Sequence, residues 1–170
     1  IECSLCYGGD IEKEETIKLL RFANRVPLLY QRGACAITKA VAETNWKQYG
    51  LQQSGKNIPL GPLVLVVHIA SVWVPFTSEA KEAIAHYPEI IKEIKLALQE
   101  CGRQLGIYIR KHIRAKEQKE KINLFEKYIP ELASSLSNLT GDKKEKIQED
   151  LLKILKKGIP ELEENGQIEK

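Results

Sequence analysis

The sequence predicts an α+β fold, in which a small sheet and a short helix precede one long helix and a helical C-terminal segment. Three observations predict it. The apolar, β-branched run at 63–74 is typical of a buried strand, and apolar residues recur at helical spacing through 33–44. After Pro88 the spacing of apolar residues alternates between three and four, which indicates a long helix packed against a partner. The 170 residues are enough for one domain with a core and an appendage.

The composition is that of a globular protein, with 43% hydrophobic residues, 29% charged residues and a formal net charge of +3. His68, Ser71 and Pro75 interrupt the longest apolar run, so the sequence predicts no membrane span, and no signal peptide is visible. The chain contains no methionine and begins at Ile1, inside an expected strand. We therefore expect a cytoplasmic fragment of a longer protein, whose active site lies mostly outside the fragment.

The four cysteines predict no metal site. Cys3 and Cys6 form a single CxxC pair, but no second pair and no histidine pair stands at the spacing that zinc sites use. Positions three apart in a strand point to opposite faces, which is unfavourable for chelation. We expect all four cysteines, including Cys35 and Cys101, to be small buried hydrophobic residues in a reducing cytoplasm.

The first 90 residues predict a βαβ-like core. Residues 1–7 form a strand, a turn and a polar loop follow, and 17–30 form a second strand region. The helix at 33–44 then leads through a polar loop to the strand at 63–74, which Pro75 ends. Thr77 or Ser78 is expected to cap a short helix at 78–86.

A long helix is expected from Pro88 to about Tyr128, which at about 1.5 Å per residue would extend roughly 60 Å. Gly102 and Gly106 weaken this helix, so we expect close backbone approach there to compensate. Residues 110–127 are polar and basic, which favours a solvated stalk, with contact to DNA as the alternative. Pro130 should end or kink the stalk. The domain division is therefore a core at 1–90, a stalk helix at 88–128 and a helical tail at 129–170.

The tail is expected to contain a short amphipathic segment and a last helix at about 143–157. Gly158 and Pro160 should stop that helix, and the final ten residues are acidic and expected to fray.

Lys81 is the first candidate functional residue. In the expected fold it falls in the first turn of the helix that follows the buried strand, where unpaired backbone N–H groups also point outward. A lysine mounted at such a strand–helix junction is suited to contact a phosphate. The alternative is a solvated surface lysine.

The second candidate is the segment Trp46-Lys47-Gln48-Tyr49, where two aromatic residues flank a lysine at a helix end. Such a cluster can stack on bases or sugars and neutralise a phosphate. Alternatively, Trp46 and Tyr49 cap the core and Lys47 is solvated. The sequence contains no nucleophile–base pair and no glycine-rich phosphate loop, so we expect no catalysis by this chain alone.

Several segments together resemble the transducer domain of the archaeal DNA topoisomerase VI B subunit. They are RFANRVPLLY at 21–30, Trp46-Lys47-Gln48-Tyr49-Gly50, the run from Val72 to Ile84, Tyr87-Pro88-Glu89-Ile90, and the helix that begins Lys92-Glu93-Ile94. The resemblance extends from Ile1 to about Leu136 and is weaker after Gly141.

The resemblance implies a ribosomal protein S5 domain 2-like core within an ATP-dependent type IIB topoisomerase. ATP and Mg²⁺ would be bound mainly by a GHKL-type ATPase domain of the same polypeptide. In that scheme Lys81 contacts the ATP γ-phosphate and contributes to catalysis, while Trp46, Lys47 and Tyr49 contact double-stranded DNA. The implied partners are the topoisomerase VI A subunit, reached through the stalk and the C-terminal region, and a second B subunit that dimerises when ATP binds.

Two other interpretations stay open at the level of sequence. One is a non-enzymatic helical adaptor in which Lys81 is incidental. The other is a transducer from a different GHKL ATPase, such as a MutL-like or gyrase-like protein.

Overall fold

The structure, a computed structural model, describes residues 1–12 and 15–157. The chain divides into two compact units, Ile1–Arg110 and a second unit that begins at Lys111. The helix α2 (Pro88–Thr140) contributes residues to both units. Within the described residues, no helix is long and apolar enough to cross a membrane.

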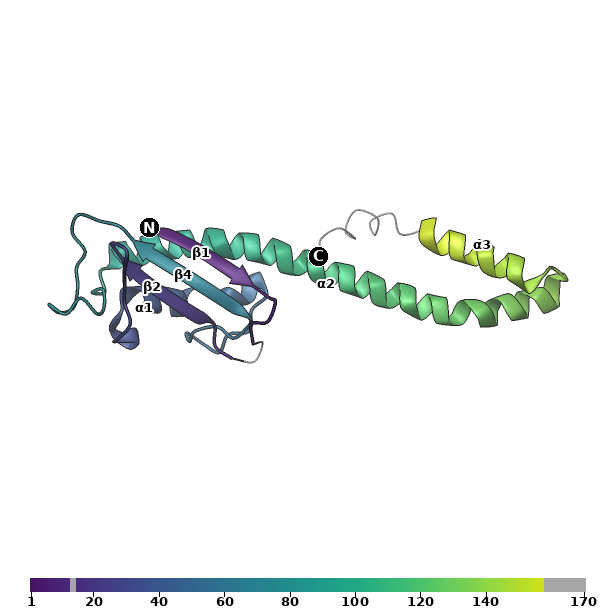
Figure 1. Ribbon diagram of the computed structural model, residues 1–170, viewed down its shortest axis with the longest axis horizontal. Coiled ribbons are helices and arrows are strands. Elements are labelled where there is room, and N and C mark those ends of the chain that lie inside the picture. The colour runs from purple at the N-terminus through teal and green to yellow at the C-terminus, as the bar shows by residue number, and fades with distance from the viewer. Residues whose placement is uncertain (13–14, 158–170) are drawn as a thin grey trace. The chain divides into compact units, whose positions relative to one another are not determined.

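A four-stranded sheet with the order β1-β4-β2-β3 forms the first unit, together with α1 (Ala36–Glu43) and the beginning of α2 (Figure 1). Its strands are β1 (Glu2–Tyr7), β2 (Lys18–Ala23), β3 (Val26–Pro27) and β4 (Leu63–Ile69). The adjacent strands β2 and β4 are parallel and α1 lies between them in sequence, whereas β1 pairs with β4 antiparallel. This arrangement confirms the predicted α+β class and its βαβ-like core.

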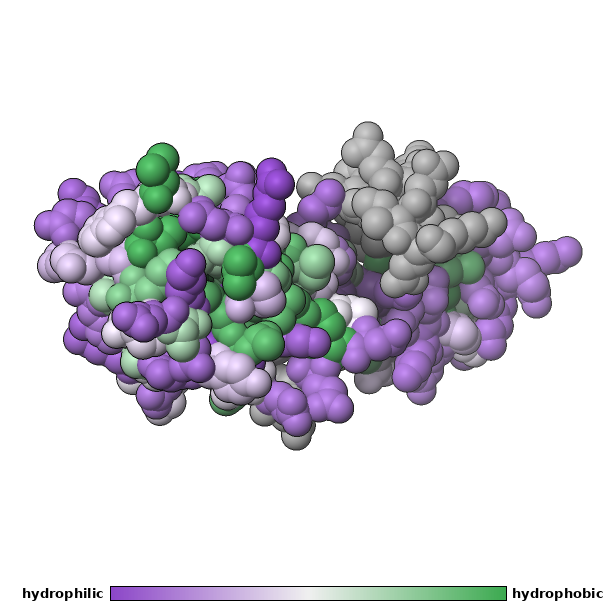
Figure 2. All heavy atoms as spheres, turned by 60° about the vertical axis from the view of Figure 1, so that its left-hand side comes forward, coloured by the Kyte–Doolittle hydropathy of each residue, from purple (hydrophilic) through white to green (hydrophobic). Residues whose placement is uncertain are grey.

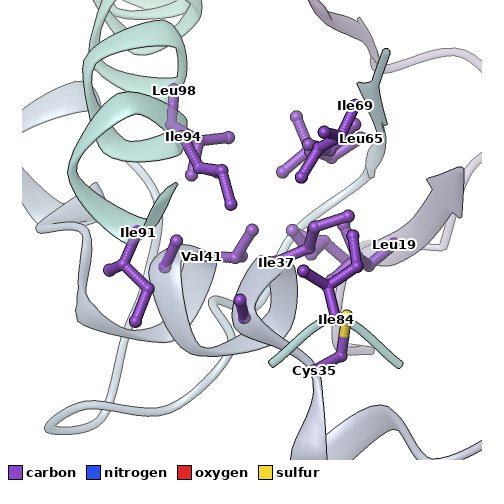
Figure 3. Packing of buried hydrophobic residues seen from close by; sticks show 14 of the residues in the cluster. Leu19, Cys35, Ile37, Val41, Leu65, Ile69, Ile84, Ile91, Ile94 and Leu98 are labelled. Carbon is purple, nitrogen blue, oxygen red and sulfur yellow. The ribbon is translucent and has the colours of Figure 1, made fainter. Parts of the chain in front are cut away.

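The sheet buries one face, because alternate residues of each strand point to opposite sides. Along β4 the side chains alternate between buried and half-buried positions. The buried positions meet α1 and α2, as Figure 3 shows: Ile37 and Val41 from α1 and Ile94 from α2 lie toward the sheet residues Leu65 and Ile69. Both helices therefore cover the same face of the sheet and enclose the hydrophobic core.

The second strand region is two strands joined by a two-residue turn. Asn24 and Arg25 have φ angles of 46° and 70°, the left-handed conformation that a type I′ hairpin turn requires. The Asn24 side chain holds this turn, because its Nδ2 donates to the carbonyl of Ser71 at 2.9 Å and its Oδ1 accepts from the Ser71 N–H at 2.9 Å. The turn is therefore tied to the segment that follows β4.

The prediction of a helix at 78–86 is wrong. The strand β4 ends at Ile69, and an antiparallel bridge between Phe76 and Ile84 closes a loop instead. Backbone bonds from Thr77 N–H to Ala83 O and from Ala85 N–H to Pro75 O flank this bridge. Ala83 and Ile84 are fully buried, so burial of this extended segment overrides the local helix-capping signal.

The predicted end of the long helix near Tyr128 is also wrong, because α2 continues through Pro130 to Thr140. A proline inside a helix removes one backbone hydrogen bond and costs about 3 kcal/mol. The side chains of Ile129 and Ala133, four apart on one face, are buried in the second unit and offset this cost. Gly141, with φ 76°, then ends α2 in the usual left-handed conformation.

The second unit also contains α3 (Lys144–Lys157), which confirms the last helix expected at about 143–157. The predicted stop at Gly158 and Pro160 and the acidic final residues lie outside the described residues.

The cysteines of β1 face opposite sides of the sheet, as strand geometry predicts. Cys3 packs against the core, whereas Cys6 is exposed, which corrects the expectation that all four cysteines are buried. Burial, reinforced by Cys101 nearby, raises the pKa of the Cys3 thiol to about 12. Cys3 is therefore held as an unreactive thiol at neutral pH, as expected of a packing residue.

Candidate functional site

Lys81 lies exposed in the loop closed by the Phe76–Ile84 bridge. The ends of the loop are fixed in the core, because Val74 and Ile84 are buried and the Ile84 carbonyl accepts a hydrogen bond from the Ala36 N–H at 2.9 Å. The first residue of α1 thus holds the base of the loop. A rigid base with an exposed lysine is an arrangement that can present a cation to a ligand outside this unit.

The backbone of Lys81 has a left-handed conformation, with φ 54°, and its N–H donates to the Ser78 carbonyl at 3.1 Å. Residues other than glycine rarely adopt this conformation, and it costs about 1 kcal/mol or more. Lys81 is therefore placed by a tight turn, and not by the helix N-terminus that the sequence predicted. Any phosphate contact would depend on the ammonium group, without help from a helix dipole.

Exposed hydrophobic side chains surround this end of the first unit. They belong to segments that contact one another: Trp73 and Tyr87 form an edge-to-face ring pair with centroids 6.3 Å apart, and Gln31 donates to Glu82 at 2.7 Å. Figure 2 shows hydrophobic residues at the surface on the side of the molecule where this loop region lies. The exposed members are Val26, Leu29, Tyr30, Val72, Trp73 and Tyr87.

The second candidate segment is a 3₁₀ turn, η2 (Trp46–Tyr49), directly after α1. Trp46 is fully buried, and its Nε1–H donates to the Val41 carbonyl at 2.8 Å. The buried Gln53 accepts from the Trp46 backbone N–H at 3.0 Å and donates to the carbonyls of Ala42 and Thr44. Gln53 was missed by sequence reasoning, because a glutamine in a polar loop gives no signal of its burial.

Tyr49 packs edge-on against Trp46 and against α2, where Gly102 and Gly106 face it. A Cβ at Gly102 would lie 2.4 Å from Cε2 of Tyr49, closer than any side chain tolerates. This contact confirms the close approach that the two glycines predict. Of the three residues expected to contact DNA, Lys47 alone is exposed, whereas Trp46 and Tyr49 support the turn from within the core.

Exchanging Gly102 for alanine is expected to destabilise the first unit by about 1–3 kcal/mol relative to the Gly106→Ala exchange. Both exchanges gain about 1 kcal/mol of helix propensity, so the difference isolates the packing against Tyr49. A Cβ at Gly106 meets a flexible Arg110 nitrogen at 3.2 Å and an ordinary 3.4 Å contact. Urea denaturation followed by circular dichroism measures both variants, and equal stability would contradict the contact.

Arg110 is the first residue of the basic stretch at 110–127, for which contact with DNA was the alternative interpretation. A Cβ placed on Gly106 would lie 3.2 Å from the Arg110 Nη1 and 3.4 Å from the Cα of Tyr49, so these two atoms lie close to each other. The Arg110 guanidinium therefore lies beside the turn that exposes Lys47. Helical spacing accounts for its position, because Arg110 follows Gly106 by four residues.

The two candidate residues are not brought together. The base of the Lys81 loop is bound to Ala36 at the start of α1, whereas η2 follows the other end of α1. His68 belongs to neither, because its Nδ1 lies 2.8 Å from Glu2 Oε2 and its Nε2 accepts from the Arg25 N–H at 3.1 Å on the sheet. Among the described residues, no group of histidine, cysteine and carboxylate side chains could hold a metal ion.

Residues 1–121 match the family model described as the topoisomerase VI B subunit, transducer. The B subunit of type 2 DNA topoisomerase 6 from Methanosarcina mazei is 49% identical over 139 residues, which cover 82% of this chain and 22% of that protein. The corresponding protein of Pyrococcus abyssi is 43% identical over 169 residues, which cover 99% of this chain and 28% of that protein. The chain thus spans about a quarter of the length of these relatives.

A solved structure, the B-subunit of DNA gyrase from Myxococcus xanthus, is 24% identical and aligns with a TM-score of 0.40. The alignment covers 61% of this chain and 30% of the gyrase chain.

Proposed function

The chain belongs to the family of topoisomerase VI B-subunit transducers, and we propose that it relays the nucleotide state of an adjoining ATPase domain to DNA cleavage and strand passage by the A subunit. The observation that carries this proposal is the exposed Lys81 on a loop whose base is fixed in the core. The core of the first unit would have the S5 domain 2-like fold, which is compatible with the βαβ arrangement of β2, α1 and β4.

Lys81 is proposed to reach the ATP γ-phosphate in the ATPase domain, which would bind ATP and Mg²⁺ through its own residues. A charge-assisted hydrogen bond from an ammonium group distinguishes a nucleotide with a γ-phosphate from one without it. The exposed hydrophobic side chains around the loop support the proposal, since such patches commonly mark interaction surfaces. The ATPase domain is the partner proposed for that surface.

The route from Lys81 toward the A subunit is proposed to run through α1 and α2. The loop base is bound to the first residue of α1, and α1 and α2 share the core through Val41 and Ile94. A change in the position of Lys81 would therefore act on packed helices, which shift as units because a close-packed core does not deform continuously. The later part of α2 and the C-terminal region are proposed to meet the A subunit, while ATP binding pairs two B subunits.

Lys47 is proposed to contact the phosphate backbone of double-stranded DNA, with Arg110 beside it. The rings of Trp46 and Tyr49 are buried, so stacking on bases is not part of this proposal. Their role would be to hold the turn that presents Lys47.

Exchanging Lys47 for glutamine in the full-length protein is expected to weaken binding to a DNA duplex and to flatten its salt dependence. Loss of one phosphate contact lowers the slope of log affinity against log salt by about 0.9. Fluorescence anisotropy over a series of salt concentrations measures the slope. An unchanged slope would leave Lys47 as a solvated lysine, and Gln48→Ala in the same turn serves as the control.

The proposed function as a whole is tested with the full-length protein and its DNA-cleaving partner, the A subunit. Supercoiled plasmid should be relaxed when both proteins, Mg²⁺ and ATP are present, and each omission should abolish relaxation. Relaxation without ATP, or ATP turnover that DNA does not stimulate, would speak against a transducer and for an adaptor.

A further inference from the structure

A cavity of about 460 Å³ opens between α1 and the first three turns of α2, entirely within the first unit. Lys39 and Glu43 line it from α1, and Lys92 and Lys95 line it from α2. It is separate from both proposed contacts, because neither Lys81 nor Lys47 is among its lining residues. The family assignment and the proposed function leave this cavity without a role.

The charge of the cavity is positive and only partly compensated. Lys95 Nζ donates to Glu43 Oε2 at 2.5 Å, so this pair is neutral overall. The same bond holds the pKa of Glu43 below its usual value, and the charges of Lys39 and Lys56 lower it further. Among the described residues, neither Lys39 nor Lys92 forms an ion pair, so the lining, with three lysines against one glutamate, carries an excess of positive charge.

The walls of the cavity are suited to a ligand with both charge and apolar surface. Ile91 and Leu96 contribute apolar side chains to the same lining, and Leu96 is 49% exposed. Gln99 adds a neutral side chain with hydrogen-bond donors and an acceptor. The sugar–phosphate backbone of DNA combines these properties, because each anionic phosphate is flanked by largely apolar deoxyribose rings.

We propose that this cavity is a second contact site for duplex DNA, in which Lys39 and Lys92 each bind a backbone phosphate and Leu96 packs against the sugar between them. The proposal rests on the proposed function, since it requires that the intact protein acts on DNA. Contacts of this kind position a duplex without reading its sequence. The site would hold a DNA segment on the α1–α2 side of the first unit.

The test uses the full-length protein with a duplex of about 40 base pairs, and anisotropy over a salt series measures binding. The double variant Lys39→Gln with Lys92→Gln removes both charges and keeps most of each side-chain stem. Lys18→Gln with Lys144→Gln is the matched control: it removes the same charge from exposed lysines, one on the opposite face of the sheet and one on α3. The slope of log affinity against log salt should fall by about 1.8 in the first variant, at about 0.9 for each phosphate.

Equal slopes in the two double variants would overturn the proposal, because a change in net charge would then explain the effect. The Lys47→Gln variant separates this outcome from failure of the proposed function: a lowered slope there with an unchanged slope for Lys39 and Lys92 rejects only the second site. If the wild-type protein does not bind the duplex at all, both fail together. Adding inorganic pyrophosphate distinguishes a site for free phosphate from a site for DNA. If pyrophosphate protects the protein against thermal unfolding but leaves duplex binding unaltered, the proposal is also overturned.

Discussion

Exchanging Lys81 for alanine in the full-length protein is expected to lower ATP turnover by about 10- to 100-fold. A hydrogen bond to a charged group contributes about 1.5–3 kcal/mol, and each 1.4 kcal/mol in the barrier is about a factor of ten in rate. Because the Lys81 side chain is exposed and not part of the hydrophobic core, the fold should be unaffected. Steady-state ATPase assays with DNA and the A subunit measure the effect, with circular dichroism as the check on folding.

Two variants in the same loop sharpen this test. Lys81→Arg keeps the cation and should retain a substantial part of the turnover, whereas Glu79→Gln changes an exposed charge two residues away and should have wild-type turnover. Because the loop stays anchored through Ile84 in all three variants, differences between them report on the ammonium group. Wild-type turnover in Lys81→Ala would eliminate the phosphate contact from the proposed mechanism.

Exchanging Trp46 for alanine is expected to destabilise the first unit by about 3–5 kcal/mol. This is the usual cost of removing a fully buried large aromatic side chain, because apolar burial is lost and a cavity remains. The exchange also leaves the Val41 carbonyl without the Nε1–H donor that it has at 2.8 Å. Urea denaturation, read by far-ultraviolet circular dichroism, measures the change in the free energy of unfolding.

Trp46→Phe provides the matched control, since it keeps most of the apolar volume and loses the Nε1–H donor. It should cost clearly less than the alanine exchange, and Lys47→Ala in the same turn should cost almost nothing because Lys47 is exposed. A Trp46→Ala variant with wild-type stability and weakened DNA binding would instead support stacking of the ring on DNA.

The parts of the fold that the sequence predicted have a strong, regular pattern. The β-branched run that forms β4 alternates between buried and half-buried residues, and the apolar spacing matches the buried faces of α1 and of α2 as far as Leu105, whereas Tyr108 and His112 of the same spacing are exposed. Here local propensity and tertiary burial favour the same structure. Gly102 and Gly106 were also interpretable, because glycines inside a helix need a packing reason.

The errors arise where local and tertiary preferences differ. Thr77 and Ser78 resemble a helix start, but burial of Ala83 and Ile84 holds the segment extended. Pro130 resembles a helix end, but the buried face that contains Ile129 continues the helix. In each case a contact distant in sequence decides, and no local pattern contains that information.

The candidate site was predicted in part. Lys81 and Lys47 are both exposed, as a contact residue must be. The burial of Trp46 was one of two interpretations that its sequence neighbourhood left open, because an aromatic residue beside a lysine looks the same at a binding surface and at the edge of a core. The distinction depends on Gln53 and on the glycines of α2. The sequence around Gln53 does not indicate that it is buried, and the glycines are distant from Trp46 in sequence.

The contact between Tyr49 and Gly102 has a consequence for how this protein can change over generations. The Tyr49 ring occupies the space that a Cβ at 102 would need. Positions 49 and 102 are therefore coupled, although they are far apart along the chain. A side chain gained at 102 clashes with the Tyr49 ring and destabilises the first unit unless ring volume is lost at 49, and that loss would alter the turn that exposes Lys47. Substitution at 102 is therefore better tolerated when position 49 changes with it.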